Sequence, residues 1–189
     1  MQWSIREMKQ EDWPKIQTIF EMAINSNLAT LEQQAPSYEF WDKTHLPMGR
    51  LVAQQEDGEV IGYAAMSPAS FQIPYLGVVE DEVAVAEDAR GEGVGKALLT
   101  ALVESADKNE LWTLEAHLLE ENEAAIALHQ ACGFRTVGRQ LKRGMDAYGH
   151  WRNVLLMERR SEKVGSVSCE GCDGPIAGFK KRKAGIAVW

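Results

Sequence analysis

The sequence is poor in the features that mark secreted, membrane-spanning and nucleic-acid-binding proteins. Its three cysteines, Cys132, Cys169 and Cys172, do not make a disulfide framework. No apolar run is long enough to cross a bilayer, and the first residues lack the basic segment and apolar run of a secretory signal. The formal net charge of −8 argues against broad nucleic-acid binding, which needs a basic surface. We therefore expect a cytoplasmic protein with neither a membrane nor a nucleic-acid partner.

Composition divides the chain into a folded body and a different C-terminal segment. Of the 189 residues, 45% are hydrophobic and 25% are charged, which suits one globular domain. Residues 161–189 are rich in glycine and lysine and have no hydrophobic period. We expect a domain over residues 1–160 and a flexible extension over residues 161–189. The lone Cys169-x-x-Cys172 pair offers two of the four ligands that structural zinc needs, so we predict two free thiols and no metal site, with a zinc site shared between two molecules as the alternative.

Hydrophobic periodicity predicts an α/β protein. Some segments repeat apolar residues at helical spacing, others alternate like strands, and Asp57-Gly58 is a favoured tight-turn pair for a hairpin. The expected order of elements gives a mixed sheet with helices on both faces. The predicted helices cover residues 10–24, 38–46, 93–108 and 121–134, and the predicted strands cover 3–8, the hairpin 50–68, 74–87, 111–119, 135–144 and 150–159.

A glycine-rich turn, residues 90–96 (RGEGVGK), joins a predicted strand to a predicted helix. Glycines let the backbone approach a ligand closely, and the free amides at the start of a helix favour an anion. Arg90 and Lys96 add positive charge. The turn lacks the Gly-Lys-Ser/Thr ending of a nucleotide P-loop and the spacing of the dinucleotide fingerprint. Taken alone, it is as compatible with an unliganded turn as with a phosphate site.

The strand before this turn carries three acids in a row. On a regular strand Glu80 and Glu82 face one way and Asp81 faces the other. A carboxylate near an anion site suits acyl transfer to an amine, because an ammonium with a pKa near ~10 must lose a proton before it attacks. The alternative is that all three acids form a solvated strand end.

Two separate motifs carry a resemblance to a known family. Arg90-x-x-Gly93-x-Gly95, with a strand before it and a helix after it, resembles the acetyl-CoA pyrophosphate loop of the GNAT N-acetyltransferases. Residues 122–138 (NEAAIALHQACGFRTVG) resemble a second segment of that superfamily. The resemblance runs over roughly residues 3–160. It implies the GNAT fold, which is a mixed and mostly antiparallel central sheet flanked by helices on both faces.

Within that superfamily the chain is most similar to the phosphinothricin acetyltransferase group. The matching segments are Val79-Glu80 and Leu128-His129-Gln130, together with the late run 149–153 (GHWRN). Gln130 and Asn153 stand where that group has acids. An arginine of the herbicide-acetylating enzymes is also absent from residues 29–37, which puts activity on phosphinothricin itself in question.

The resemblance also implies roles for individual residues. Glu80 would be the general base, with Glu82 in reserve, and His129 would protonate the departing thiolate. A buried structural histidine is the alternative for His129. The resemblance also implies a homodimer, and from the residues themselves we expect Tyr75 and Trp151 to contact the acceptor. The expected contacts with acetyl-CoA are Arg90, Gly91, Gly93, Val94, Gly95 and Lys96 at the pyrophosphate, the backbones of Val83 and Val85 at the thioester arm, and Asn122.

These observations together predict an acetyl-CoA-dependent N-acetyltransferase. Its acceptor would be the primary amine of a small molecule, an amino acid or analogue of the phosphinothricin or methionine sulfoximine type. Transfer would be direct, with a glutamate base and no required metal. Two alternatives stay open: acetylation of a protein N-terminus or lysine, and a non-catalytic acyl-CoA-binding module.

Overall fold

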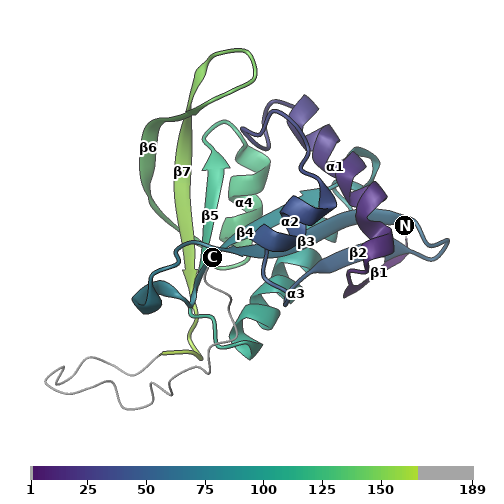
Figure 1. Ribbon diagram of the computed structural model, residues 1–189, viewed down its shortest axis with the longest axis horizontal. Helices are drawn as coiled ribbons and strands as arrows, with labels where there is room; N and C mark the ends of the chain where they lie inside the picture. Colours follow the sequence, from purple (N-terminus) through teal and green to yellow (C-terminus); the bar gives the residue numbers. More distant parts are fainter. Residues whose placement is uncertain (1, 166–189) are drawn as a thin grey trace, which may run out of the picture.

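A seven-stranded mixed sheet forms the centre of the protein, whose computed structural model describes residues 2–165 (Figure 1). The strand order is β1-β2-β3-β4-β5-β7-β6, and only β4 and β5 run parallel to each other. The strands are β1 (Trp3–Glu7), β2 (Leu51–Gln55), β3 (Val60–Pro68), β4 (Val78–Val85), β5 (Thr113–Leu119), β6 (Arg135–Met145) and β7 (Trp151–Arg160).

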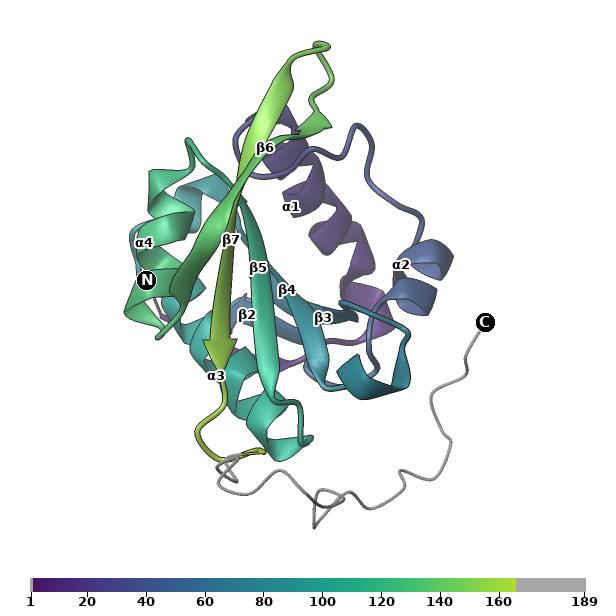
Figure 2. The same cartoon turned by 90° about the vertical axis from the view of Figure 1, so that its left-hand side faces the viewer.

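Two layers of helices cover the sheet, with α1 (Trp13–Asn25) and α2 (Tyr38–Thr44) on one face and α3 (Val94–Lys108) and α4 (Glu123–Ala131) on the other (Figures 1 and 2). Helix α1 begins with Pro14 in its first turn, where the missing N–H costs nothing, and it buries Ile16 and Ile19. Helix α3 buries one apolar stripe against β2, β3 and β4. The main core therefore lies on both sides of the central strands.

The predicted architecture is confirmed, including the mixed, mostly antiparallel sheet and the helices on both faces. Three short 3₁₀ turns were not predicted, η1 (Gln10–Asp12), η2 (Ile73–Tyr75) and η3 (Glu87–Ala89). Turns η2 and η3 shorten the strand expected over residues 74–87 to Val78–Val85. Strand β7 ends at Arg160, and the Cys169–Cys172 pair lies outside the described residues. Within residues 2–165, no helix combines the length and apolarity needed to span a bilayer.

Strands β4 and β5 separate partway along their length. They pair only from Val78 to Glu80 against Thr113 to Glu115, although β4 continues to Val85 and β5 to Leu119. In a parallel pair, the backbone N–H and C=O groups on the facing edges form their hydrogen bonds with the neighbouring strand. The opening beyond Glu80 therefore leaves the β5-facing edge of β4 without a strand partner.

Candidate active site

The three acids of β4 project to opposite faces of the sheet, as the strand alternation predicts. Glu80 and Glu82 lie on the face covered by α1 and α2, where Glu82 contacts His45 just after α2. Asp81 lies on the other face and contacts His129 of α4. Consecutive residues thus place one chemical type in two separate environments.

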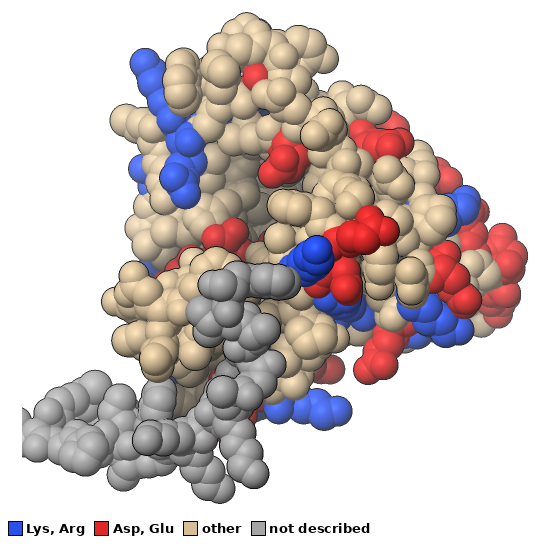
Figure 3. All heavy atoms as spheres, viewed as in Figure 1, with Lys and Arg blue, Asp and Glu red and all other residues tan. Residues whose placement is uncertain are grey.

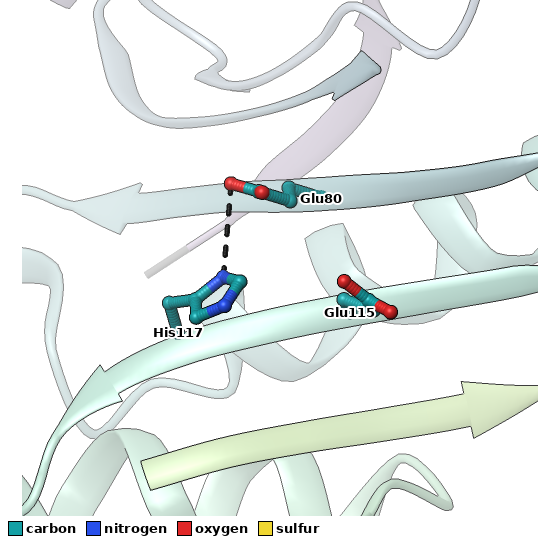
Figure 4. Close-up of side chains that lie close together, drawn as sticks. All are labelled: Glu80, Glu115 and His117. Carbon is teal, nitrogen blue, oxygen red and sulfur yellow. Dashed lines mark ion pairs between the residues drawn. The ribbon is translucent and has the colours of Figure 1, made fainter. Parts of the chain in front are cut away.

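Glu80 faces a histidine that comes from the neighbouring strand (Figure 4). His117 Nδ1 lies 3.7 Å from Glu80 Oε2, and the two side chains are 26% and 42% exposed. The facing imidazole lowers the pKa of Glu80, and the charge of Arg143 lowers it further, whereas burial raises it. Glu80 in turn raises the pKa of His117, as Glu115 does more weakly. Burial raises the pKa of Glu115.

Glu82 has both carboxylate oxygens occupied. His45 Nε2 lies 2.8 Å from Oε2, and the hydroxyl of the buried Tyr63 donates to Oε1. Burial, followed by the charge of Glu82, raises the pKa of Tyr63 well above its usual value. His45 also stacks on Trp41 of α2, so this network joins α2 to the sheet. Glu80 therefore has the freer carboxylate of the two candidate bases.

Asp81 and His129 form a buried pair between β4 and α4. His129 Nε2 lies 2.9 Å from Asp81 Oδ2, and His129 Nδ1 lies 2.7 Å from the carbonyl oxygen of Ala125. Burial alone would lower the pKa of His129, but Asp81 and the Ala125 carbonyl outweigh it, so the pKa is raised. Both ring nitrogens are engaged, and the pair lies on the opposite face of β4 from Glu80.

The glycine-rich turn presents an open backbone at the start of α3. Gly91 and Gly93 both have φ of +81°, and a Cβ built on either would meet nothing within 4 Å. Gly93 is the N-cap of α3, so the first amides of the helix, from Val94 to Lys96, have no intrahelical partner. Gly95 instead packs closely, since a Cβ there would lie 3.3 Å from Leu128 of α4. A shallow depression of about 420 Å³ runs from Gly93 along the exposed side of α3.

The backbone of Val83 and Val85 faces the opening between β4 and β5. Ala86 N donates to Ile61 O and Ala69 N donates to Val78 O. By alternation, the even-numbered residues of β4 direct their backbone groups toward β3 and the odd-numbered ones toward β5. Val83 and Val85 lie beyond the last β4–β5 pair, so an extended ligand arm in the opening would find both amides and the carbonyl of Val83. The carbonyl of Val85 accepts a hydrogen bond of 3.4 Å from Arg90 Nε.

Asn122, on the far side of the opening, is the N-cap of α4. Its side-chain oxygen accepts a hydrogen bond of 3.1 Å from the backbone N–H of Ala125. Such a cap stabilises the start of a helix. The amide group of Asn122 has no partner among the described residues, so it stays available to a ligand.

A hollow lies between the β6–β7 hairpin and helices α1 and α2 (Figure 3). Acidic side chains lie in the hollow, and basic side chains line its β6 edge. Tyr75 is 51% exposed on η2 and Trp151 is 60% exposed at the start of β7. Figures 1 and 2 place η2 and the tip of the β6–β7 hairpin far apart in the molecule.

Two arginines at the β6–β7 hairpin differ in the contacts that they make. Arg152 contacts Asp146 at 3.1 Å and Glu121 at 3.3 Å and is only 13% exposed. The His150 backbone N–H lowers the pKa of Asp146, and Arg152 contributes as well. Arg143 is exposed on β6, and its charge acts on Glu80 and His117. Arg152 is therefore held by two ion pairs, whereas Arg143 is exposed to solvent.

Glu80, Glu115 and His117 each offer one ligand atom, and these atoms lie within 4.8 Å of one another. A cation could be held by such a trio, although three ligands leave a site open. The positive charge of Arg143 beside Glu80 and His117 opposes that occupancy. The arrangement suits proton handling better than metal binding.

The sequence reasoning missed His117, His45 and Tyr63. His117 follows Glu115 by two positions in the predicted strand 111–119, so alternation alone puts both on one face. That this face lies beside Glu80 depends on the parallel register of β4 and β5. No local signal indicates that register.

Comparisons with known proteins agree with the geometry. Residues 4–134 match the model of the Acetyltransferase (GNAT) family. The chain is 32% identical over 163 residues to the L-methionine sulfoximine/L-methionine sulfone acetyltransferase of Pseudomonas aeruginosa, covering 84% of this chain and 94% of that protein. It superposes with a TM-score of 0.79 on a phosphinothricin acetyltransferase from Sinorhizobium meliloti in complex with acetyl-CoA, at 28% identity and with 89% and 93% of the two chains covered. A ribosomal-protein-alanine N-acetyltransferase from Brucella melitensis gives a TM-score of 0.76 at 30% identity, with 84% and 99% covered.

Proposed function

Because the chain belongs to the GNAT acetyltransferase family, we propose that it transfers acetyl from acetyl-CoA to the primary amine of a small amino acid or amino-acid analogue. The observation that carries this proposal is the opening between β4 and β5, which has Glu80 at its apex and the amides of α3 at its mouth. The likeness to the Pseudomonas protein supports an amino-acid analogue as the acceptor.

The residues of the opening would divide the work as follows. The amides from Val94 to Lys96 and the charge of Arg90 bind a diphosphate at the positive end of α3. The backbone of Val83 and Val85 holds the pantetheine arm and donates to the carbonyl oxygen as it gains charge. Bound acetyl-CoA supplies the thioester.

Glu80, partly exposed on the acceptor face, is the proposed group that takes the proton of the ammonium, directly or through a water. His129 is the proposed donor to the departing thiolate. Asp81 favours the imidazolium form of His129, which is the form that has a proton to give. One of its two hydrogen bonds would have to be exchanged for that step.

Arg143 extends the proposal to the acceptor. An amino acid presents a carboxylate beside its amine, and a guanidinium binds carboxylates through two parallel hydrogen bonds. Arg143 is exposed near Glu80 and His117, whereas Arg152 is held by Asp146. A carboxylate at Arg143 would therefore bring the amine to Glu80.

A second acceptor, a protein N-terminus, is supported by the likeness to the Brucella structure and by the open hollow of Figure 3.

A homodimer is supported by the edge strand β6, which leaves Val137, Leu141 and Met145 between 45% and 67% exposed. Sedimentation velocity of the wild type and of Leu141→Glu tests the dimer, since an interface on β6 would be lost in the variant.

The test of the proposed function is a screen of amino acids, their analogues and N-terminal peptides with acetyl-CoA and a thiol-detecting reagent. We expect turnover with free amino acids or analogues and, in Glu80→Gln, a fall in kcat of ~10²–10⁴-fold with unchanged acetyl-CoA affinity. Glu59→Gln, in the β2–β3 hairpin, is the matched control. Acetyl-CoA binding without turnover on any acceptor would instead identify a non-catalytic binding module.

A further inference from the structure

We infer that His117 accepts the amine proton from Glu80 and so acts on the reaction through Glu80. This inference rests on the proposed function, because it assigns the route by which the Glu80 carboxyl group loses its proton between turnovers. It starts from the juxtaposition in Figure 4, in which the carboxylate of Glu80 on β4 points at the imidazole of His117 on the adjacent β5.

The fold holds these two side chains in register. Glu80 pairs with Glu115 in the only parallel ladder of the described sheet, so His117 lies one pleat further on the same face. This is also the point at which β4 and β5 separate, and therefore the apex of the opening. Among the described residues, the imidazole of His117 has no ion-pair partner other than Glu80, and 26% of this side chain is exposed to solvent, with which the ring can exchange a proton.

The chemistry of the amine explains why Glu80 alone is a poor base. Proton transfer from an ammonium with a pKa near ~10 to an ordinary carboxylate, with a pKa near ~4.3, has an equilibrium constant that is unfavourable by more than about five powers of ten. Transfer to an ordinary imidazole, with a pKa near ~6.5, is unfavourable by fewer than about four. The surroundings widen this difference, because the pKa of Glu80 is lowered and that of His117 is raised. The proton is therefore more stable on His117 than on Glu80.

The step is balanced within the pair. The ammonium N–H bond breaks as Glu80 takes the proton, and the freed lone pair forms the C–N bond at the thioester carbonyl while the C–S bond breaks. The second proton that the nitrogen loses balances the one that His129 gives to the departing thiolate, so one proton in total leaves through Glu80. The proton on Glu80 passes to Nδ1 of His117, which becomes imidazolium and restores the carboxylate. The imidazolium then releases its outer N–H proton to water. Exchange with solvent moves the remaining proton from Nδ1 to Nε2, so that Nδ1 again faces Glu80 without a proton and the neutral ring is ready for the next turnover.

Charged groups on the neighbouring strands act on His117 and on Glu115. Glu80 on β4 and Glu115 on β5 raise the pKa of His117, and Arg143 on β6 lowers it. Glu158 on β7 raises the pKa of Glu115. Each of these charges can be removed singly, so the pH dependence of the reaction can be moved in a predicted direction.

The kinetic test compares the pH profiles of kcat/KM. The wild type should lose rate as the pH falls through the raised pKa of His117. We expect His117→Gln to lose at least tenfold in kcat near pH 7, to keep its affinity for acetyl-CoA, and to lack that limb. Glu115→Gln should move the limb to lower pH and Arg143→Gln should move it to higher pH. Added imidazole should restore part of the rate of His117→Ala, which a purely structural role would not allow.

A His117→Gln variant that keeps both the wild-type limb and the wild-type kcat would overturn the inference and leave Glu80 as the sole base. A wild-type rate that falls on addition of a chelator would overturn it too, since the trio would then hold a metal ion.

A second measurement does not depend on turnover. The ring signals of His117 are identified by their loss in His117→Gln, and their titration is followed by NMR in the wild type and in Glu80→Gln. We expect the pKa of His117 to fall when the carboxylate is removed. An unchanged titration sinks the inference even if the enzyme acetylates amino acids, whereas a wild type without any turnover sinks the proposed function while the coupling of the pair is still measured.

Discussion

His129 Nε2 lies 2.9 Å from Asp81 Oδ2, and both side chains are almost completely buried between β4 and α4. Asp81 Oδ1 has no hydrogen-bond partner among the described residues, so the carboxylate depends on this one contact. The pair connects α4, which lies in the second segment of the resemblance (residues 122–138), to the strand that carries Glu80. It therefore concerns stability as well as proton transfer.

We expect Asp81→Asn to lower the free energy of unfolding by about 3 kcal/mol at pH 6, because it leaves a buried imidazolium without its counter-charge. The folded-state pKa of His129 is raised, so the contribution of the pair is complete below the unfolded pKa near ~6.5 and is lost as the pH rises through the raised value. The difference between wild type and variant should thus shrink toward pH 9. Urea unfolding at both pH values measures it, and a difference independent of pH would contradict this account.

The glycine turn allows binding and stability to be separated. Gly93→Ala puts a Cβ at φ of +81° in open space, so the backbone strain should cost ~1–2 kcal/mol of stability. Gly58→Ala, at φ of +93° in the β2–β3 hairpin, is a matched control with the same strain and no ligand role. We expect similar losses in thermal unfolding but at least a tenfold loss of acetyl-CoA affinity in Gly93→Ala alone. Equal affinities in calorimetry would remove the turn from the binding site.

Arg143 should distinguish acceptors by their carboxylate. Loss of a charge-assisted contact is worth ~1.5–3 kcal/mol, so Arg143→Gln should raise KM for an amino-acid acceptor by ~10–100-fold. The decarboxylated amine with the same side chain should be affected much less, and comparing the two cancels the effect of Arg143 on the pKa of His117. Arg139→Gln, on the same strand and paired with Glu120, serves as the control. A similar loss on both acceptors would argue against carboxylate recognition.

Much of the fold and part of the site could be predicted from local sequence. Pro14, the Asp57-Gly58 turn and the apolar periods indicate where helices and the hairpin lie, because capping, turn geometry and amphipathicity are local properties. The separation of Glu80 and Glu82 from Asp81 follows from the two-residue period of a strand. The open backbone at the start of α3 could also be predicted, because glycine has no side chain and readily adopts the positive φ of Gly91 and Gly93. The 3₁₀ turns at either end of β4 escaped prediction because a segment of three residues is too short to show a hydrophobic period.

Sequence by itself determined the order of the elements, the faces of β4 and the character of the glycine turn, since each depends on residues within a few positions of one another. Tertiary structure alone decided which groups meet. His129 reaches Asp81 across 48 positions, His45 reaches Glu82 across 37, and the register of β4 and β5 brings His117 to Glu80. Strand register and helix docking are set by packing of the whole core, so no local pattern of residues encodes these encounters.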